Sequence, residues 1–419
     1  MLKGPGKEPT MLYQLHELQR RLLSPITSFA EGAASLYSTV GSPLSYLPFA
    51  REMSASYGLL HRLGKDYEKP HFGISETTVR GAPVAVVEED IIVKPFCVLK
   101  HFKRDTRARD PKVLVCAPLS GHHSTLLRDT VRQLITEHDV YLTDWVDARM
   151  VPLGDGSFHL DDYIAYVIEF IAHLGPDVHV ISVCQPTVPV LVAISLMAAE
   201  NHPQSPRSMT MMGGPIDTRR NPTEVNALAM KKPFSWFENN VIYRVPSNYP
   251  GYMRRVYPGF LQHAGFVAMN PDRHVNSHWE YYKHLVEGDG ESASQHRAFY
   301  DEYNAVLDMD ADYYLDTIKM VFQQHALPTG TWVTGPTLGH RMVEPAAIRK
   351  TALFTIEGEL DDISGSGQTE AAHGLCSGIP SAKKQHFTAP KCGHYGIFAG
   401  RRWREAIYPK IAAFIRKNA

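Results

Sequence analysis

The chain has 419 residues, of which 44% are apolar and 21% are charged. This composition is that of a folded globular protein and excludes a disordered or collagen-like chain. The 43 basic and 44 acidic side chains leave a formal net charge of −1. No long-range field of one sign is therefore available to hold nucleic acid or anionic lipid. The length fits one large α/β domain with an inserted subdomain as well as it fits several smaller domains.

Five cysteines are present and none of them forms a C-x-x-C pair; they are Cys97, Cys116, Cys184, Cys376 and Cys392. We therefore expect neither a disulfide framework nor a cysteine zinc site. The first ten residues include a basic residue but no apolar core, so no secretory signal is expected. The longest apolar run, 190–199, is far shorter than the roughly 18 residues of a membrane span. These features predict a soluble cytoplasmic protein.

The first predicted element is an amphipathic helix with apolar residues at i, i+4, i+7 and i+11, namely Met11, Leu15, Leu18 and Leu22. This helix is expected to end at Pro25 and to be followed by a second short helix over 26–36. Packing of the stripe against its own domain is favoured over binding to a membrane or particle surface. Residues 64–80 are polar and typical of a linker, so 1–80 are predicted to form a helical arm and linker.

From residue 81 the pattern changes to short apolar strands. Strands over 84–87 and 91–100 are predicted on either side of an acidic turn, 88–90. Six further strands are predicted at 112–117, 138–145, 177–183, 208–212, 351–357 and 385–389, with helices at 161–171, 188–199 and 403–415. Strands that are apolar throughout and alternate with helices are typical of a parallel sheet buried on both faces. Residues 81–215 and 346–419 are therefore predicted to form two parts of one α/β core.

The span between these two parts, 216–345, lacks this alternation. From Phe234 to Phe322, 18 of 89 residues are aromatic, against 10% for the whole chain. We interpret 216–345 as an inserted cap. Its aromatic side chains form either a small core of their own or a surface for an apolar substrate.

Cys184 directly follows an apolar strand and precedes the helical run 188–199. A nucleophile at such a strand-to-helix turn stands above the sheet. The helix N-terminus beneath it favours the thiolate, and the backbone N–H of Gln185 faces a developing oxyanion. The alternative is an inert cysteine buried at the end of a strand, which is the commoner state of a free cysteine.

Two later loops offer partners for this thiol. Asp361 and Asp362 follow the strand 351–357, and either carboxylate can orient a histidine, with the spacing from Gly358 favouring Asp361. The alternative is a solvated acidic stretch. His394 lies between glycines after the last strand. The order nucleophile, acid, histidine is that of the α/β-hydrolases.

The loop 117–123 follows an earlier strand and can supply a second N–H to an oxyanion hole, from Leu119 or Ser120. His122 and His123 are neighbours in this loop, but adjacent side chains point apart and no carboxylate is placed to complete a metal site. No Walker-type loop is present, and no G-x-G-x-x-G follows a strand. We therefore expect neither a metal nor a cofactor.

Seven groups of segments resemble the intracellular polyhydroxybutyrate depolymerases. They are S-V-C-Q-P at 182–186, A-P-L-S-G-H at 117–122, T-L-L-R-D-T-V at 125–131, D-W-V-D-A-R at 144–149, Y-Y-L-D-T-I at 313–318 with H-A-L-P at 325–328, E-G-E-L-D-D-I at 357–363 and G-H-Y-G-I-F at 393–398. The resemblance extends from about Met11 to the C-terminus. It implies an α/β-hydrolase that degrades stored polyester granules with a Cys-Asp-His triad.

The resemblance implies Cys184 as nucleophile, Asp361 as the residue that orients the histidine, and His394 as base. It also implies that Ser120 and Gln185 form the oxyanion hole and that 216–345 covers the site. Substrate contacts are expected from Leu119, His122, Trp236 and Tyr395, with Phe237, Tyr243 and Tyr249 as further aromatic candidates in the cap. The implied partners are the polymer or its oligomers and the granule surface; a homodimer is also considered.

The glycines that usually lie two residues on either side of the nucleophile are replaced by Ser182 and Pro186. This loses the tolerance that glycine gives to a strained turn, but it agrees with the depolymerase pattern. The related polyester synthases use a G-x-C-x-G box, and its absence favours degradation. Two alternatives stay open: a synthase-like or CoA-dependent acyltransferase, including thiolysis of the polymer, and a non-catalytic granule-surface protein.

Overall fold

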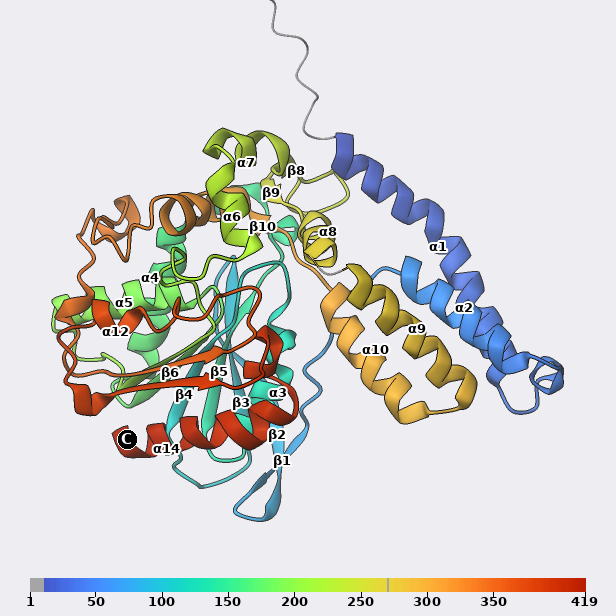
Figure 1. Cartoon of the computed structure of the whole chain (residues 1–419), viewed down its shortest axis with the longest axis horizontal. Coiled ribbons are helices and arrows are strands. Elements are labelled where there is room, and N and C mark those ends of the chain that lie inside the picture. The colour runs from blue at the N-terminus through green and yellow to red at the C-terminus, as the bar shows by residue number, and fades with distance from the viewer. Residues whose placement is uncertain (1–10, 270) are drawn as a thin grey trace, which may run out of the picture.

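The computed structural model describes residues 11–269 and 271–419. The first ten residues, in which we expect no secretory signal, lie outside the described part. A nine-stranded sheet runs in the order β1-β2-β3-β5-β4-β6-β7-β11-β12 (Figure 1). The strands are β1 (Glu76–Val79), β2 (Ala82–Val93), β3 (Cys97–Arg104), β4 (Lys112–Cys116), β5 (Asp139–Trp145), β6 (Val178–Val183), β7 (Ser208–Met212), β11 (Ala352–Gly358) and β12 (Lys384–Ala389). The pairs from β5 to β12 are parallel, whereas β1, β2, β3 and β5 pair antiparallel.

Every residue of β6, β7 and β11 is buried, so the parallel part of the sheet is covered on both faces, as its apolar strands predicted. The covering helices are α3 (Arg128–Leu134), α4 (Leu160–Leu174), α5 (Thr187–Ala199), α12 (Ala372–Leu375), α13 (Gly400–Arg402) and α14 (Tyr408–Asn418). A π-helical segment, 403–407, joins the last two. The predicted strands agree with the structure to within one residue at either end from 112 onward.

The predicted acidic turn at 88–90 is wrong. These residues lie inside β2, which continues through a bulge between Asp90 and Ile92. The carboxylates face lysines of β3: Glu89 pairs with Lys103 at 2.8 Å and Asp90 with Lys100 at 2.7 Å. Opposite charges across an antiparallel pair stabilise the strand, and sequence spacing alone does not reveal this cross-strand pairing.

The predicted end of the first helix at Pro25 is also wrong. Helix α1 runs from Met11 to Ser38 through Pro25. An internal proline removes one helical hydrogen bond and costs roughly 3 kcal/mol. Packing against α2 (Ala50–Gly64) compensates, since His61 Nδ1 donates to Thr27 O at 3.0 Å and Ser54 Oγ donates to Ala34 O at 2.9 Å.

In its described residues the insertion contains six α-helices and a small antiparallel sheet in the order β10-β9-β8. Its elements are α6 (Glu224–Lys231), α7 (Phe234–Asn240), β8 (Tyr243–Arg244), β9 (Arg255–Tyr257), α8 (Gly259–Met269), α9 (Pro271–Glu287), α10 (Gly290–Asn304), β10 (Met309–Asp310) and α11 (Ala311–Thr317). A π-helical segment, 318–323, follows α11. Part of the aromatic content of the insertion forms a separate core, in which Phe237 packs with Ile242 and Leu315.

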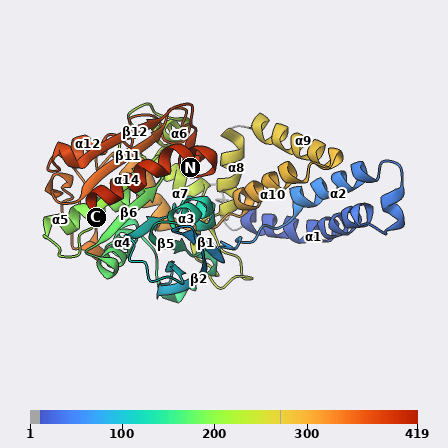
Figure 2. The ribbon, with the colours of Figure 1, turned by 90° about the horizontal axis from the view of Figure 1, so that it is seen from below.

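The N-terminal helices pack on this insertion. Helix α2 contacts α9, and α9 contacts α10, so α1, α2, α9 and α10 project together to one side of the sheet in two perpendicular views (Figures 1 and 2). Arg62 of α2 is buried and pairs with Asp301 of α10 at 3.0 Å. The arm and the inserted helical hairpin therefore support each other.

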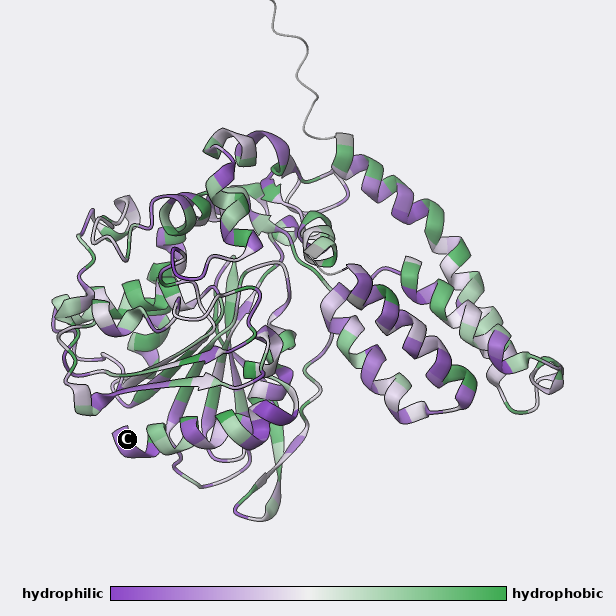
Figure 3. Ribbon diagram, in the orientation of Figure 1, coloured by the Kyte–Doolittle hydropathy of each residue, from purple (hydrophilic) through white to green (hydrophobic). Residues whose placement is uncertain are grey.

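Helix α1 presents two kinds of surface. Tyr13 and Ala30 are buried, whereas a row of apolar side chains is 41–68% exposed: Leu12, Leu15, Leu18, Leu22, Ile26, Phe29 and Leu36. Hydrophobic positions recur along the helix (Figure 3). The expected packing of the predicted stripe is therefore wrong: Leu15, Leu18 and Leu22 are exposed, and a different face of α1, which carries Tyr13 and Ala30, packs on the rest of the chain. No helix in the described chain has the length and hydropathy to cross a membrane.

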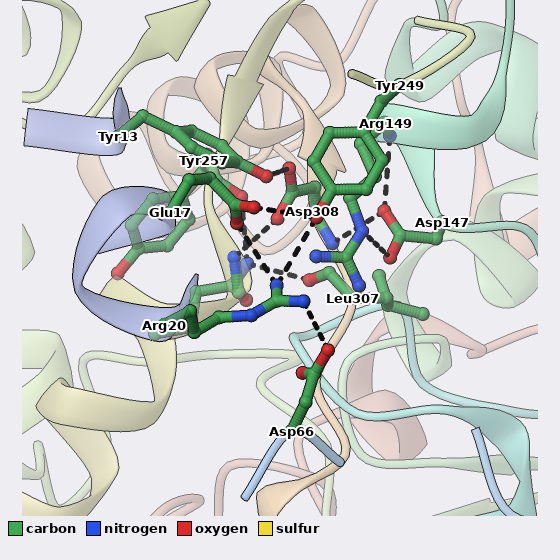
Figure 4. Close-up of polar contacts among 12 residues, drawn as sticks. Tyr13, Glu17, Arg20, Asp66, Asp147, Arg149, Tyr249, Tyr257, Leu307 and Asp308 are labelled. Carbon is green, nitrogen blue, oxygen red and sulfur yellow. Dashed lines mark hydrogen bonds and ion pairs between the residues drawn. The ribbon is translucent and has the colours of Figure 1, made fainter. Parts of the chain in front are cut away.

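A buried polar cluster attaches α1 to the core (Figure 4). Tyr13 donates to Asp308 Oδ2 at 2.7 Å, and Asp308 Oδ1 accepts from Gly259 N at 2.8 Å. Asp147 pairs with Arg149 at 2.8 Å and accepts from the backbone N–H of Asp308 at 3.1 Å. Burial, reinforced by the nearby Asp308 charge, raises the pKa of Asp147 to about 7.

The Tyr13 hydroxyl is expected to be a principal contact of this cluster. Tyr13→Phe keeps the ring but leaves a buried carboxylate oxygen without its donor, which costs about 1–3 kcal/mol. The variant should show a lower free energy of unfolding in urea and faster proteolysis of α1. Tyr46→Phe, at a tyrosine that is 74% exposed, is the matched control. Equal behaviour of the two variants would contradict the proposed anchoring.

Candidate active site

Five loops meet at the carboxyl edge of the parallel strands, where ligands bind in open α/β sheets. They follow β4, β6, β7, β11 and β12. Sequence analysis selected four of these loops, and it did not select the loop after β7.

Cys184 occupies the turn between β6 and α5 with a left-handed backbone, φ 66°. Such a conformation is strained for a residue with a side chain and is typical of the sharp turn that presents a nucleophile. Its backbone N–H donates to Met212 O of β7 at 2.7 Å, and its carbonyl accepts from Thr187 N at 3.1 Å. Cys184 is half-buried, whereas the other four cysteines are fully buried and all five are free.

The residues that replace the usual glycines fit their positions. Ser182 is fully buried in β6 with its hydroxyl 3.4 Å from Thr210 O of β7. Pro186 has helical backbone angles and is the cap residue directly before α5, where its missing N–H costs no helical bond. The turn is therefore compatible with this sequence.

Asp361 and His394 form a buried hydrogen-bonded pair. His394 Nδ1 lies 2.8 Å from Asp361 Oδ2, and their side chains are 4% and 0% exposed. The other oxygen, Asp361 Oδ1, accepts from Ile363 N at 2.9 Å and from Ser364 N at 2.8 Å. These donors fix the carboxylate, which in turn fixes the imidazole ring. The structure thus favours Asp361 over Asp362 as the partner of the histidine.

Cys184 lies close enough to His394 for its sulfur to influence the charge of the imidazole. Burial opposes a charge on the imidazole, but the Asp361 carboxylate and the neighbouring Cys184 outweigh it and raise the pKa of His394 well above its ordinary value. The three residues are therefore neighbours in the order carboxylate, imidazole, thiol, and their environment favours an imidazolium near the sulfur.

The predicted donors of the oxyanion hole are two backbone N–H groups, that of Ser120 in the loop after β4 and that of Gln185 directly after Cys184. Ser120, half-buried, follows β4, and Gln185 is 9% exposed at the start of α5. Among the hydrogen bonds of the described residues, neither N–H donates to a protein acceptor. The thirteen-residue helix α5 begins two residues after Gln185, so its N-terminal dipole favours negative charge here.

The remaining predicted contact residues are placed differently. Leu119 is buried in the loop after β4. His122, in the same loop, lies with Nε2 3.1 Å from Tyr303 O of α10, and burial lowers its pKa to about 4. The ring of Tyr395 lies 5.9 Å from that of His394. Trp236 packs on Phe237 inside the insertion, and none of its described contacts reaches these loops.

Two of the other cap aromatics hold structure together. Tyr249 donates to Glu17 of α1 at 3.1 Å, and the Arg149 guanidinium lies 5.1 Å above its ring. Tyr243 packs beside Val245 and Val256. In the described chain no three histidine, cysteine, aspartate or glutamate residues are grouped to hold a metal ion.

Gly213 and Tyr313 belong to the site and were not selected from the sequence. Gly213 follows β7 with φ 57°, and a Cβ there would lie 2.5 Å from Ile397 Cδ1 and 3.3 Å from both Asp361 Oδ2 and His394 Cε1. Tyr313 of α11 is 1% exposed; burial, with the proximity of Cys184 adding to it, raises its pKa. For Gly213, the available signal in the sequence was a glycine directly after a predicted strand.

A mostly parallel sheet, a strained strand-to-helix turn carrying a thiol, and the chain order Cys184, Asp361, His394 define an α/β-hydrolase. A family model described as "PHB de-polymerase C-terminus" matches residues 213–419. The chain belongs to this family of PHB depolymerases and is a carboxylic-ester hydrolase. No curated protein gives a significant match.

Solved structures with distant similarity include three hydrolases. They are the 2-hydroxy-6-oxo-6-phenylhexa-2,4-dienoate hydrolase of a Rhodococcus species (12% identity, 80% of this chain and 99% of that chain, TM-score 0.41), a hydrolase from Pseudomonas aeruginosa (13%, 78% and 98%, TM-score 0.42) and a thermophilic esterase from Thermogutta terrifontis (12%, 82% and 97%, TM-score 0.38). The fold assignment depends on the sheet order and the site described above, not on these scores.

Gly213→Ala tests how closely the loop after β7 packs against the Asp361–His394 pair. The added methyl group meets Ile397 at 2.5 Å and requires φ 57° of a residue that disfavours it. Displacement of His394 by about 1 Å costs on the order of 10²-fold in rate, so hydrolysis of a short ester should fall by about that factor. Gly374→Ala, where a Cβ meets nothing within 4 Å, is the control and should keep full activity.

Proposed function

We propose that the protein hydrolyses the ester bonds of poly(3-hydroxybutyrate) through an acyl-cysteine intermediate on Cys184. The observation that carries this proposal is the hydrogen bond between Asp361 and His394, with Cys184 beside the imidazole at the carboxyl edge of the sheet. Membership of the PHB depolymerase family supports the polymer as the substrate. The products are 3-hydroxybutyrate oligomers or monomers.

In the first half of the reaction, His394 takes the proton of the Cys184 thiol and the thiolate attacks the ester carbonyl carbon. The backbone N–H groups of Ser120 and Gln185 hold the resulting oxyanion; one such donor is typically worth about 10²–10³-fold in rate. The C–O bond then breaks. His394 gives its proton to the departing alkoxide, and a 3-hydroxyacyl thioester stays on Cys184.

In the second half, His394 takes a proton from water and the hydroxide attacks the thioester carbonyl. The C–S bond breaks, the thiolate recovers its proton, and the acid leaves. Asp361 keeps the imidazole in the tautomer with a proton on Nδ1 and stabilises the imidazolium in both halves. Because a thioester is more electrophilic than an oxyester, the intermediate does not accumulate as a dead end.

We further propose a cytoplasmic location at the surface of storage granules. The exposed apolar row on α1 supports this location, because contiguous exposed apolar side chains mark interaction surfaces. The polymer is a water-insoluble solid, so the enzyme has to work at its surface. Adsorption through α1 and hydrolysis at Cys184 are separate functions of the chain.

Cys184→Ala should lower turnover on amorphous polymer by on the order of 10⁶-fold, as loss of a nucleophile does, while binding to granules persists. Cys376→Ala is the control, since burial raises the pKa of that thiol to about 12 and keeps it inert. The assay measures free 3-hydroxybutyrate products with and without CoA. Retained activity in Cys184→Ala would refute the nucleophile assignment. Release of acyl-CoA in place of the free acid when CoA is added to the unaltered protein would favour thiolysis over hydrolysis.

Asp361→Asn should lower the pKa of His394. The carboxylate is the main favourable charge that keeps the imidazolium protonated above its ordinary range, so its removal makes the ring lose its proton at lower pH, and turnover should fall by on the order of 10⁴-fold. Histidine NMR titration measures the pKa directly. Glu370→Gln changes an exposed carboxylate in the same region and should leave the titration unchanged; a matching shift in both variants would refute the assignment.

A further inference from the structure

A cavity of about 480 Å³ lies between α9, α10 and the loops that follow β11 and β12. Its walls use one face of each helix: His274, Ser277 and Tyr281 from α9, and Gln295, Phe299 and Tyr303 from α10. These residues recur at three- and four-residue spacing, so the two helices present continuous faces to it. The volume falls within the roughly 300–1,000 Å³ of ligand-binding pockets.

This cavity begins beside the candidate active site. Asp362 and Tyr395 line it, and they are the immediate neighbours of Asp361 and His394 in the chain. The ring of Tyr395 lies 6.3 Å from Phe299 and 6.4 Å from Tyr303 and 5.9 Å from His394. The aromatic side chains therefore connect the cavity wall directly to the loop that holds the imidazole.

Helix α10 also contacts the other side of the site. The carbonyl of Tyr303 accepts from His122, which lies two residues after Ser120. Thr125 in the next turn donates to Glu302 at 2.7 Å. Helix α10 therefore contacts both the proposed oxyanion loop and, through Phe299 and Tyr303, Tyr395 in the loop of His394.

The walls suit an uncharged ligand with apolar and carbonyl groups. Tyr281 and Tyr300 stack on either side of His296, each with ring centroids 4.4 Å apart. Burial, with His278 nearby, lowers the pKa of His296 to about 4, so this ring is neutral at neutral pH. The hydroxyl of Ser277 and the amide of Gln295 are donors suited to ester carbonyl oxygens.

The charged side chains that line the cavity favour an uncharged ligand over an anionic one. No lysine or arginine lines it in the described chain, and Glu280 and Asp362 contribute carboxylates. Glu280 pairs with Lys283 at 2.6 Å, which leaves the wall close to neutral.

We infer that this cavity is a binding subsite for consecutive, uncharged 3-hydroxyacyl ester units of the polymer chain next to the bond that is cut. The inference rests on the proposed function and adds to it: contacts with α9 and α10 make the enzyme select for chain length. A substrate with a single ester bond cannot reach the cavity, whereas an oligomer of several units fills it. Binding energy from these remote units is then available for catalysis.

Two variants that fill the cavity test this inference. Gln295→Trp and Ser277→Trp place a bulky ring into it from opposite walls. Both should lower kcat/KM for an end-blocked 3-hydroxybutyrate hexamer at least tenfold more than they lower kcat/KM for p-nitrophenyl butyrate. Ser294→Trp, at the exposed neighbouring position of α10, is the matched control and should lower neither. Equal losses on both substrates, or no loss on the hexamer, would overturn the inference.

A second measurement does not depend on the folding of these variants. In Cys184→Ala protein, the hexamer should slow amide hydrogen exchange in α9 and α10, and absence of protection there would also overturn the inference. Unaltered protein that cleaves neither substrate would instead refute the proposed function, so the two failures are distinguishable.

Discussion

Residue 184 has to hold a left-handed backbone for its thiol to stand clear of the sheet, and the surrounding chain is arranged to make this conformation stable. The strand next to it accepts its N–H, and a fully buried helix starts directly after it. The same turn exposes the N–H of Gln185 and directs the sulfur toward His394. A strained backbone persists only where its neighbours fix it, so the position of the Cys184 thiol, the direction of the Gln185 N–H and the approach of the sulfur to His394 all depend on this turn.

The parallel core and the residues at its carboxyl edge were predictable from the sequence because their signals are local. Strands buried on both faces are apolar throughout, and a loop after such a strand lies at the functional edge whatever its own conformation. Cys184, Asp361 and His394 each follow such a strand directly or within a few residues. Their convergence in space follows from the parallel order of the strands, which alternation with helices already implied.

The features that sequence analysis missed depend on contacts between distant segments. Proline at position 25 signals a helix end, and only the hydrogen bonds from α2 explain why the helix continues. The carboxylates of 88–90 resemble a turn until the lysines of the neighbouring strand are seen. Gly213 is one of 30 glycines, and its role depends on Asp361 and His394, which lie far along the chain. Propensity is a weak guide where such tertiary contacts decide the outcome.

The packing of α2 on α9 has a consequence for synthesis of the chain. The two helices are separated by about 200 residues, and domains fold as units while the ribosome extends the chain from its N-terminus. Throughout that interval α1 and α2 can pack only on each other, and the face of α2 that α9 later covers stays open to water. The arm therefore reaches its final packing only after about two thirds of the chain has been synthesised, although its own helices are the first to be made.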